Sequence, residues 1–356
     1  MLEKPVKSDA AAVALEVEAH QGAPAIIDQV AGSADPRHIF LRRPWFEAAS
    51  DELTTLVATR ADGRAIAALP SYRAKPGLRA VPGSYWPYRS FPVAADASDA
   101  ELAAFLSSGE ARRAMGPAWR LGPVYDDDAT ARRLLTIAPS SGWTILTRRL
   151  GTSYRLDVDA LEAEGSWPRT STLRKNRWIE RRLAELGELE WRTVSGSDWS
   201  PEVFDTLAEI ERNSWVWQNT DRSGAKFAAP ESRHYWQRAV ADPAFAKLAA
   251  AALLHIGGKP AAYTFSLHTG RTRYYVANGY DERFAKHSLG RALLYRDFQQ
   301  AIEAGAREIG WGSGDSGYKT EMGAVAGPEI LDLLFVRSRA LAALARPFWE
   351  RSASKG

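Results

Sequence analysis

Three short apolar segments joined by two tight turns constrain this chain more than any other feature. They cover residues 248–256, 261–268 and 273–279, and the turns between them read G-G-K-P and T-G-R-T. Strands joined by such short turns pair as antiparallel neighbours, because a parallel pair needs a crossover of a dozen or more residues. The sequence therefore predicts a three-stranded antiparallel sheet in this region.

A helix and a further strand follow this sheet. The apolar pattern predicts a helix over 288–304, ended by Gly305, and a strand over 308–312. A helical crossover allows the new strand to lie parallel to the last strand of the antiparallel sheet. We therefore expect an α/β (α+β) fold with a mixed sheet flanked by helices.

The length of the chain predicts two domains. Its 356 residues are 45% hydrophobic and 25% charged, so each half can bury a core of its own. We place the boundary between domains 1–150 and 151–356. The expected elements of the first domain are a strand at 10–19, a short helix at Trp45 and Phe46, a hairpin at 53–72, a loop at 76–98, a helix at 99–114, a strand at 118–125, a helix at 128–137 and a strand at 142–150. The second domain is expected to begin with helices at 169–186 and from Ser200-Pro201, a loop at 215–227 and a helix at 231–241.

Composition argues against several classes of protein. The chain has no run of 18 apolar residues, and its first residues lack the apolar core of a secretory signal, so we expect a cytoplasmic protein. The absence of cysteine excludes disulfides, thiolate metal sites and a cysteine nucleophile. Six scattered histidines without an H-E-x-x-H pattern argue against a metal site. The chain has no helix-turn-helix, RNP or zinc pattern, so we expect no nucleic-acid partner.

The segment most indicative of chemistry is the hexamer H-S-L-G-R-A at 287–292. It stands where a strand has ended and a helix begins. A helix N-terminus carries unpaired N–H donors and the positive end of the helix dipole, so it binds phosphate well. Gly290 would let the backbone approach a ligand closely, and Ala292 would leave the next turn unobstructed. An ordinary glycine at an ordinary helix start is the alternative interpretation.

This hexamer resembles the Q/R-x-x-G-x-G/A pyrophosphate loop of the GNAT superfamily. His287, Gly290 and Ala292 occupy the three positions, and His287 departs from the family's Gln or Arg. A wider resemblance, over nearly the whole chain, is to the FemAB-like, cellulose-biosynthesis-type acetyltransferases, which carry tandem GNAT-like domains. The matching segments are H-I-F-L-R-R-P-W-F, R-K-N-R-W-I-E-R-R-L, A-N-G-Y-D-E-R-F-A-K-H-S-L-G-R-A-L-L and G-S-G-D-S-G-Y-K. The N-terminal half has no counterpart of the hexamer and would be a degenerate domain, so we expect one CoA per chain.

The resemblance implies an N-acyltransferase that uses acyl-CoA as co-substrate and needs no metal. The residues it places along CoA are Val276, Asn278, His287, Ser288, Leu289, Gly290, Arg291 and Ala292. It implies catalytic roles for Asp315, Tyr318 and Lys319. Tyr318 would protonate the departing thiolate, Asp315 would orient the acceptor or take its proton, and Lys319 would screen developing charge or hold a CoA phosphate. In the alternative interpretation Asp315 is a turn residue and Tyr318 only packs.

The acceptor is expected to be an amine, and several features favour a lipid amine. Trp215 and Trp217 lie where GNAT-like enzymes bind acceptors. The basic run at 169–182 surrounds Trp178, and the C-terminal segment 337–351 is a basic amphipathic helix candidate ending in Phe348 and Trp349. Together they suggest an enzyme at the anionic inner surface of a membrane, and a resemblance to the bacterial ceramide synthases.

Alternatives to this assignment stay open. The basic run is also typical of a solvated helix face. The C-terminal helix alternatively packs onto a neighbouring domain. One alternative acceptor is an amino sugar of envelope polysaccharide. One alternative donor is an aminoacyl-tRNA. From another class, the chain would be a non-catalytic scaffold for envelope polysaccharide biosynthesis.

Overall fold

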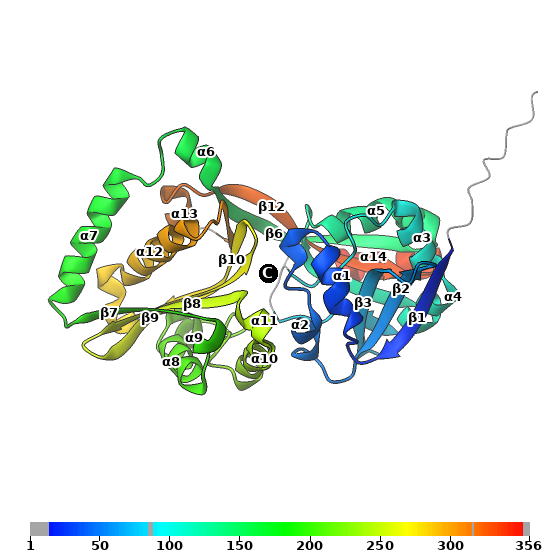
Figure 1. The fold of residues 1–356 in the computed structure, drawn as a ribbon, viewed down its shortest axis with the longest axis horizontal. Helices are drawn as coiled ribbons and strands as arrows, with labels where there is room; N and C mark the ends of the chain where they lie inside the picture. Colours follow the sequence, from blue (N-terminus) through cyan, green and yellow to red (C-terminus); the bar gives the residue numbers. More distant parts are fainter. Residues whose placement is uncertain (1–13, 85–87, 315–316, 352–356) are drawn as a thin grey trace, which may run out of the picture.

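The computed structural model describes residues 14–84, 88–314 and 317–351. Its backbone is organised around a twelve-stranded mixed sheet with helices on both faces (Figure 1). The strand order is β1-β2-β3-β4-β5-β12-β6-β11-β10-β9-β8-β7. Within the described residues, β4 with β5 and β10 with β11 are parallel pairs, and the other neighbours are antiparallel. The expected mixed sheet flanked by helices is confirmed.

The strands and helices follow one another along the chain as α/β segments. The strands are β1 (Leu15–Gln21), β2 (Thr54–Arg60), β3 (Ala65–Lys75), β4 (Leu78–Ala80), β5 (Ala118–Tyr125), β6 (Thr144–Asp157), β7 (Leu189–Ser195), β8 (Ala249–Ile256), β9 (Lys259–Thr269), β10 (Thr272–Tyr280), β11 (Glu308–Ser313) and β12 (Val325–Val336). The helices are α1 (Ile26–Ser33), α2 (Arg43–Glu47), α3 (Asp99–Ser107), α4 (Gly109–Met115), α5 (Ala129–Ser141), α6 (Val158–Ala163), α7 (Thr170–Ala184), α8 (Pro201–Arg212), α9 (Trp215–Asn219), α10 (Pro230–Val240), α11 (Pro243–Ala246), α12 (Leu289–Glu303), α13 (Tyr318–Glu321) and α14 (Arg339–Arg351), with short 3-10 turns η1 (Pro36–His38), η2 (Gly196–Asp198) and η3 (Glu282–His287).

Side-chain alternation along the strands assigns the helices to the two faces. Successive residues of a strand point to opposite sides of the sheet. On β8, Leu254 joins the apolar cluster formed by α7 and α12, whereas Leu253 joins the cluster that includes α8. On β6, Leu146 packs with Ala342 of α14, whereas Ile145 packs on the other side against the main core. Both halves of the sheet are therefore covered on both faces.

The apolar core is continuous between the two halves of the chain. Trp45 of α2 is fully buried, and its ring lies 5.9 Å from that of Trp236 and 6.2 Å from that of Phe245. The Tyr235 hydroxyl donates a hydrogen bond to the Trp45 carbonyl at 2.9 Å. The segment around Trp45 thus serves as the contact between the halves.

The predicted boundary at residue 150 falls inside β6. This strand pairs with β12 along nearly its whole length and with β11 at its C-terminal end. β12 also pairs with β5, and α14 then lies on β6, so the end of the chain returns to strands of the first half. The assignment of residues 1–150 and 151–356 to two domains stays a prediction.

Most predicted elements are confirmed, and four are wrong in detail. The strand expected at 10–19 is present as β1 (Leu15–Gln21), and residues 10–13 of that prediction lie outside the described residues. The antiparallel sheet 248–279, the helix after it and the parallel strand at 308–312 are present as β8 to β10, α12 and β11. The segment 76–98 contains the short strand β4, and the segment 215–227 contains α9. The helix expected at 99–114 is divided at Ser108, which ends α3 and caps α4 through the Ala111 amide. The strand expected at 142–150 continues to Asp157 because β11 and β12 pair with that continuation.

None of the helices in the described part of the chain is long and apolar enough to cross a membrane. The same residues contain no group of three or more His, Asp or Glu side chains that could hold a metal ion.

A buried ion pair fixes η1 to the start of α5. Nε2 of His38 lies 2.6 Å from Oδ2 of Asp128, whose other oxygen accepts bonds from the Ala131 amide and the Ser90 hydroxyl. Burial by itself lowers the pKa of His38, but the Asp128 carboxylate outweighs it and the pKa is raised. Burial raises the pKa of Asp128, but the charge of His38 lowers it further, so this pKa lies below its ordinary value.

This pair should give the folding stability a pH dependence of defined sign. A raised histidine pKa contributes stability that is complete below about pH 6.5 and is lost as pH rises through the folded-state pKa. The free energy of unfolding should therefore fall over that interval in the natural protein and fall less in His38→Gln. Since the substitution leaves Asp128 buried without its partner, it should cost about 3 kcal/mol or more. Denaturant unfolding across pH measures both effects. His20→Gln, at a more exposed site on β1, is the matched control, and an equal pH slope in all three proteins would contradict the assignment.

Candidate active site

The two parallel strands β10 and β11 separate after three paired positions. Their ladder joins Thr272–Tyr274 to Glu308–Gly310 and ends there, although β10 continues to Tyr280 and β11 to Ser313. On its other edge β10 has a register shift against β9 between Tyr275 and Ala277, so Val276 occupies a bulge. Beyond Tyr274 the facing edges of β10 and β11 are therefore not paired with each other. An extended ligand with amide groups fits such an opening, because it can bond to strand edges.

A buried lysine accounts for part of this separation. Lys319 is 4% exposed, and its ammonium group donates to the carbonyl oxygens of Trp311 at 2.6 Å, Ser313 at 3.0 Å and Gly312 at 3.4 Å. These carbonyls are directed at Lys319 instead of across to β10. Gly312 also has a φ of +61°, which glycine adopts without strain. The end of β11 is thus bent away from its neighbour by contacts with α13.

The start of α12 provides donors for an anion. Ser288 has a φ of +54° and turns the chain from η3 into the helix. Within the described part of the chain, the backbone amides of Leu289, Gly290 and Arg291 have no hydrogen-bond partner. Such first-turn amides, together with the positive end of a 15-residue helix, form a site suited to phosphate.

Gly290 is required by packing as well as by any ligand. A Cβ atom placed on Gly290 would lie 2.8 Å from Cδ1 of Tyr280. The aromatic ring at the end of β10 therefore lies directly on the first turn of α12. The expectation that Gly290 serves ligand approach alone is incomplete, because the sequence did not reveal this contact.

A buried polar cluster holds α12 on the sheet. The Asp297 carboxylate is 1% exposed and accepts a hydrogen bond from the Thr264 hydroxyl at 2.6 Å and another from the Arg273 guanidinium at 3.2 Å. Because an unpaired buried charge is costly, these contacts fix the helix relative to β9 and β10. The start of α12 is thereby kept opposite the opening between β10 and β11.

A cavity of about 400 Å³ lies where these elements meet. The residues that line it are Asn278, Tyr280, Ala285, Ser288, Gly290, Arg291, Leu294 and Tyr318. Five of them were among the predicted site residues: Asn278, Ser288, Gly290, Arg291 and Tyr318. The structure thus brings together the end of β10, the start of α12 and the start of α13, although these segments are separated in the sequence.

Sequence reasoning missed three lining residues. Leu294 follows Gly290 by four positions, so helical spacing alone puts both on one face of α12. Tyr280 is the last residue of β10, and its position next to Gly290 depends on how the strand meets the helix. Ala285 lies in η3, a turn that apolar periodicity does not predict.

The other predicted CoA residues lie outside this lining. Leu289 and Ala292 are fully buried in the cluster with α7, so only their backbone is available to a ligand. Val276 is 5% exposed and packs in the main core. His287 is half-buried at the end of η3.

The remaining predicted site residues are dispersed. Trp215 of α9 is 57% exposed, and the Arg222 guanidinium lies 4.6 Å from the Trp217 ring. α9 contacts β10, yet neither tryptophan lines the 400 Å³ cavity. Asp315 lies outside the described residues. Lys319 is directed at the end of β11, as described above.

An ion pair connects the two helices that border the cavity. The Arg291 guanidinium lies 2.6 Å from the Glu321 carboxylate, and the Arg291 side chain is only 16% exposed. The Tyr318 ring packs edge-on against Trp311, with 5.5 Å between ring centroids. These contacts fix α13, and hence Tyr318, relative to α12. Burial raises the pKa of Tyr280, and the charge of Glu282 adds to this effect, so its hydroxyl is protonated at neutral pH.

A single buried carboxylate organises the loop on the opposite face of β9 and β10. Glu211, at the end of α8, is 3% exposed and accepts bonds from the amides of Lys226, Phe227 and Ala228 and from the Tyr263 hydroxyl. The Tyr263 ring in turn lies against Gly279 of β10, where a Cβ atom would be 2.8 Å away. Glu211 therefore supports the strand that borders the cavity without touching it.

Removal of this carboxylate should strongly destabilise the protein. Glu211→Ala leaves three buried amides and a hydroxyl without an acceptor, and about 3 kcal/mol or more of the free energy of unfolding should be lost. Urea unfolding followed by tryptophan fluorescence measures the change. Glu209→Ala, on an exposed position of the same helix, should change it by less than about 0.5 kcal/mol. Similar values for the two variants would show that the network contributes little.

Comparison with known proteins agrees with this geometry. Residues 170–320 match the family model described as an acetyltransferase (GNAT) domain. They include β7 to β11, α12 and the start of α13, and hence every residue that lines the cavity. No curated protein matches the chain in sequence.

Solved structures share the fold over nearly the whole chain at low identity. FemX is similar with a TM-score of 0.58 and 12% identity, over 92% of this chain and all of that one. The C-terminal domain of a putative lysylphosphatidylglycerol synthetase from Agrobacterium fabrum is similar with a TM-score of 0.55 and 17% identity, over 90% of this chain and 92% of that one. A tandem GNAT protein from the clavulanic acid biosynthesis pathway is similar with a TM-score of 0.50 and 14% identity, over 91% of this chain and 99% of that one.

Fold and family model together define the class of this protein. It is an acyltransferase enzyme with a GNAT-type fold, as the sequence predicted.

Proposed function

We propose that this enzyme transfers an acyl group from acyl-CoA to an amine in the cavity between β10, α12 and α13. The supporting observation is the combination of unpartnered amides at the start of α12 with the separated strands beside them. The pyrophosphate of CoA would accept hydrogen bonds from the amides of Leu289, Gly290 and Arg291. The pantetheine arm would then extend along the unpaired edge of β10, past Asn278.

The reaction needs one bond to form and one to break. The neutral amine attacks the thioester carbonyl carbon, the carbon–sulfur bond breaks, the nitrogen loses a proton, and the thiolate gains one. Tyr318 supports the last step, because it borders the cavity on the side of α13. We assign the proton of the amine to Asp315, which follows Ser313 by two residues in the sequence. Lys319 would act through the carbonyls of β11 and thus position the site.

Calorimetry with CoA and acetyl-CoA tests the donor assignment. We expect one CoA bound per chain and product formation when acyl-CoAs of increasing length are incubated with a panel of amines and analysed by mass spectrometry. Absence of CoA binding would overturn the proposal. It would then favour an aminoacyl-tRNA donor.

For the acceptor we propose a lipid amine, of which a sphingoid base is the expected example. α7 supports this choice because it contacts α12 and η3, and so lies next to the cavity. It carries Trp178, 53% exposed, beside an open groove of about 780 Å³ whose charged lining residues are Arg174, Arg177, Arg181 and Glu180. An exposed aromatic ring among cations suits a membrane interface.

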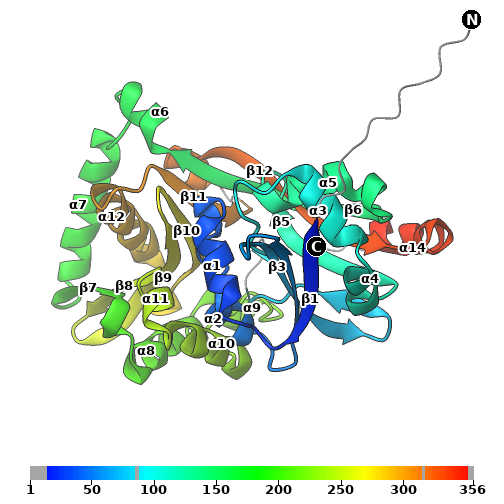
Figure 2. The same ribbon diagram turned by 45° about the vertical axis from the view of Figure 1, so that its right-hand side comes forward.

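The three features that the sequence suggested would act together do not lie on one surface. α7 (green, left in Figure 1) and α14 (red, right) are at opposite ends of the molecule, and Figure 2 shows the same separation after rotation. Of the three features, α9 contacts β10, and α7 contacts α12 and η3, which border the cavity. The proposal for the acceptor therefore rests on α7 and α9, without the C-terminal helix.

Competition between acceptors tests this proposal. We expect faster acylation of a long-chain amino alcohol than of glucosamine, with palmitoyl-CoA preferred to acetyl-CoA. Acetylation of the amino sugar at the higher rate would favour the envelope polysaccharide alternative and leave the CoA-dependent chemistry in place.

A further inference from the structure

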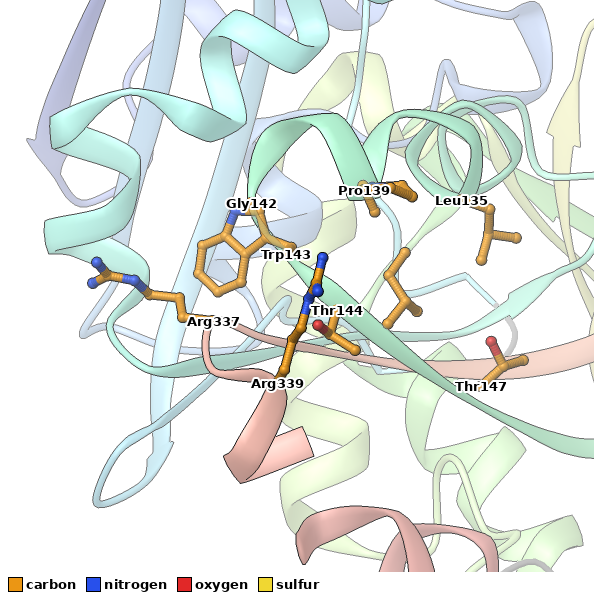
Figure 3. Close-up of a pocket in the computed structure, with 10 residues that line it drawn as sticks. Leu135, Pro139, Gly142, Trp143, Thr144, Thr147, Arg337 and Arg339 are labelled. Carbon is orange, nitrogen blue, oxygen red and sulfur yellow. The ribbon is translucent and has the colours of Figure 1, made fainter. Parts of the chain in front are cut away.

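A second groove lies in the N-terminal half, far from the acyl-transfer cavity. It has a volume of about 440 Å³, within the usual range for sites of small ligands. Its lining comes from the end of α5, the start of β6 and the entry to α14, and it includes Leu135, Pro139, Trp143, Thr144, Arg337 and Arg339. Figure 3 shows Leu135 and Pro139 along one side and Arg339 extending from the start of α14 toward Thr144.

Apolar side chains line this groove together with threonines and arginines, and no acid among the described lining residues faces its cations. Its charged lining residues are arginines, and neither Asp nor Glu is among the residues that line it. Arg112 lies close by as well, since a Cβ atom on Gly142 would be 3.3 Å from its Nη2. Arg337 donates to the Arg112 carbonyl at 3.3 Å, and Arg339 lies at an exposed position. The groove therefore suits a ligand with an apolar chain and an anionic head.

The helix that borders the groove exposes apolar side chains. Ala342, Ala345 and Trp349 pack α14 on the sheet, while Leu341, Leu344 and Phe348 are 41%, 71% and 76% exposed. At about 100° per residue, the outward face of α14 also carries Ala340, Ala343 and Pro347. Three of its charged residues, Arg339, Arg346 and Glu350, fall on one flank, and Arg351 follows at the end of the helix. An exposed apolar helix face of this kind marks a contact with lipid or with another protein.

We propose that this groove binds an anionic phospholipid and that α14 lies on the membrane surface beside it. The lipid phosphate would bind Arg339 and Arg337 at the level of the headgroups, and an acyl chain would lie along Leu135, Pro139 and Trp143. Leu344 and Phe348 would enter the acyl layer of the same leaflet. Charge complementarity selects this occupant, because arginines beside apolar side chains attract an anionic headgroup more than a neutral one. The site does not depend on the acyl-transfer chemistry.

Vesicle binding by the full-length chain tests the proposal. We expect co-sedimentation with phosphatidylglycerol-containing vesicles, weaker binding to phosphatidylcholine alone, and loss of the difference at high salt. Arg339→Gln should lower the affinity for the anionic vesicles about fivefold, the effect of roughly one cation near a membrane surface. The double variant Leu344→Ser and Phe348→Ser should lower binding to all vesicles by about tenfold or more. Arg73→Gln, an exposed position on β3, is the matched control and should bind like the natural protein.

Two further readouts separate the lipid from other occupants. A photoreactive phosphatidylglycerol should cross-link to peptides that contain residues 135–147 and 337–349. Light scattering should give the same particle mass for the natural protein and the Leu344→Ser, Phe348→Ser variant. Equal binding of Arg339→Gln and Arg73→Gln to anionic vesicles would overturn the proposal. The proposal would also be overturned if only the Arg174→Gln, Arg181→Gln variant of α7 lost vesicle binding. It would likewise be overturned if the natural protein were a dimer that the Leu344→Ser, Phe348→Ser variant dissociates. Activity on a soluble amine without vesicles should be equal in all α14 variants, so a failure of the proposed chemistry is seen separately.

Discussion

Replacement of Tyr318 by Phe is expected to lower kcat by about a hundredfold or more, with the affinity for CoA changed by less than about twofold. Tyr318 lines the cavity and its ring packs edge-on against Trp311, so the substitution removes the proposed proton donor and keeps the ring contact. A group that acts mainly in the transition state affects kcat more than ground-state binding. Steady-state kinetics with a thiol-detecting assay, together with calorimetry for CoA, measure the two quantities.

Tyr280→Phe provides the matched control for this prediction. It removes a hydroxyl from the same cavity, on the side of β10 and not of α13. We expect its kcat to stay within about threefold of the natural enzyme, since one neutral hydrogen bond contributes little. Equal losses in the two variants would point to a general effect of cavity polarity, and an unchanged kcat in Tyr318→Phe would leave Tyr318 as a packing residue.

The second large effect is expected at Gly290. Gly290→Glu should abolish CoA binding, because its carboxylate would stand among the amides that are proposed to bind the pyrophosphate. The structure adds a contribution that is independent of charge, since any Cβ atom there meets the Tyr280 ring at 2.8 Å. The fold should therefore be somewhat less stable in every Gly290 variant.

Gly290→Ala separates the two contributions. It introduces the Cβ atom without the charge, and an overpacked contact of this kind costs about 1–3 kcal/mol. We expect Ala to weaken CoA binding by about tenfold and Glu to eliminate it, with similar melting temperatures for both variants. If Ala removes CoA binding as completely as Glu, the contact with Tyr280 and not the phosphate site accounts for the glycine. If Glu still binds CoA normally, the phosphate-loop assignment fails.

The acyl-transfer cavity and the proposed lipid groove beside α14 lie at different ends of the molecule. The acyl-transfer cavity is formed by β10, α12 and α13, and α14 lies at the other end (Figure 1). Variants of α14 can therefore be examined for lipid binding without disturbing the cavity, and Tyr318 variants for catalysis without disturbing α14. This independence makes both proposals testable on one protein.

Local sequence patterns determined the elements that carry the site. The strands 248–279 were predicted because tight turns leave only antiparallel pairing between them. The α12 helix and its first turn were predicted because periodicity and Gly305 fix a helix within one segment. Asn278, Ser288, Gly290, Arg291 and Tyr318 could be named as candidate site residues because they belong to short motifs that resemble those of GNAT enzymes. Each of these inferences uses residues that are neighbours in the chain.

The tertiary structure alone decided how those elements meet. The continuation of β6 beyond residue 150 depends on pairing with β11 and β12, which are more than 150 residues away. The separation of β10 from β11 involves Lys319 and the carbonyls of Trp311 to Ser313, and the contact of Tyr280 with Gly290 depends on the angle between a strand and a helix. The placement of α7 and α14 at opposite ends likewise has no local signal. Periodicity identifies which surfaces of the strands and helices are apolar, but it does not say which surface packs on which. Strand register, crossing angles and long-range contacts are therefore decided only when the whole chain packs and these apolar surfaces are buried against one another.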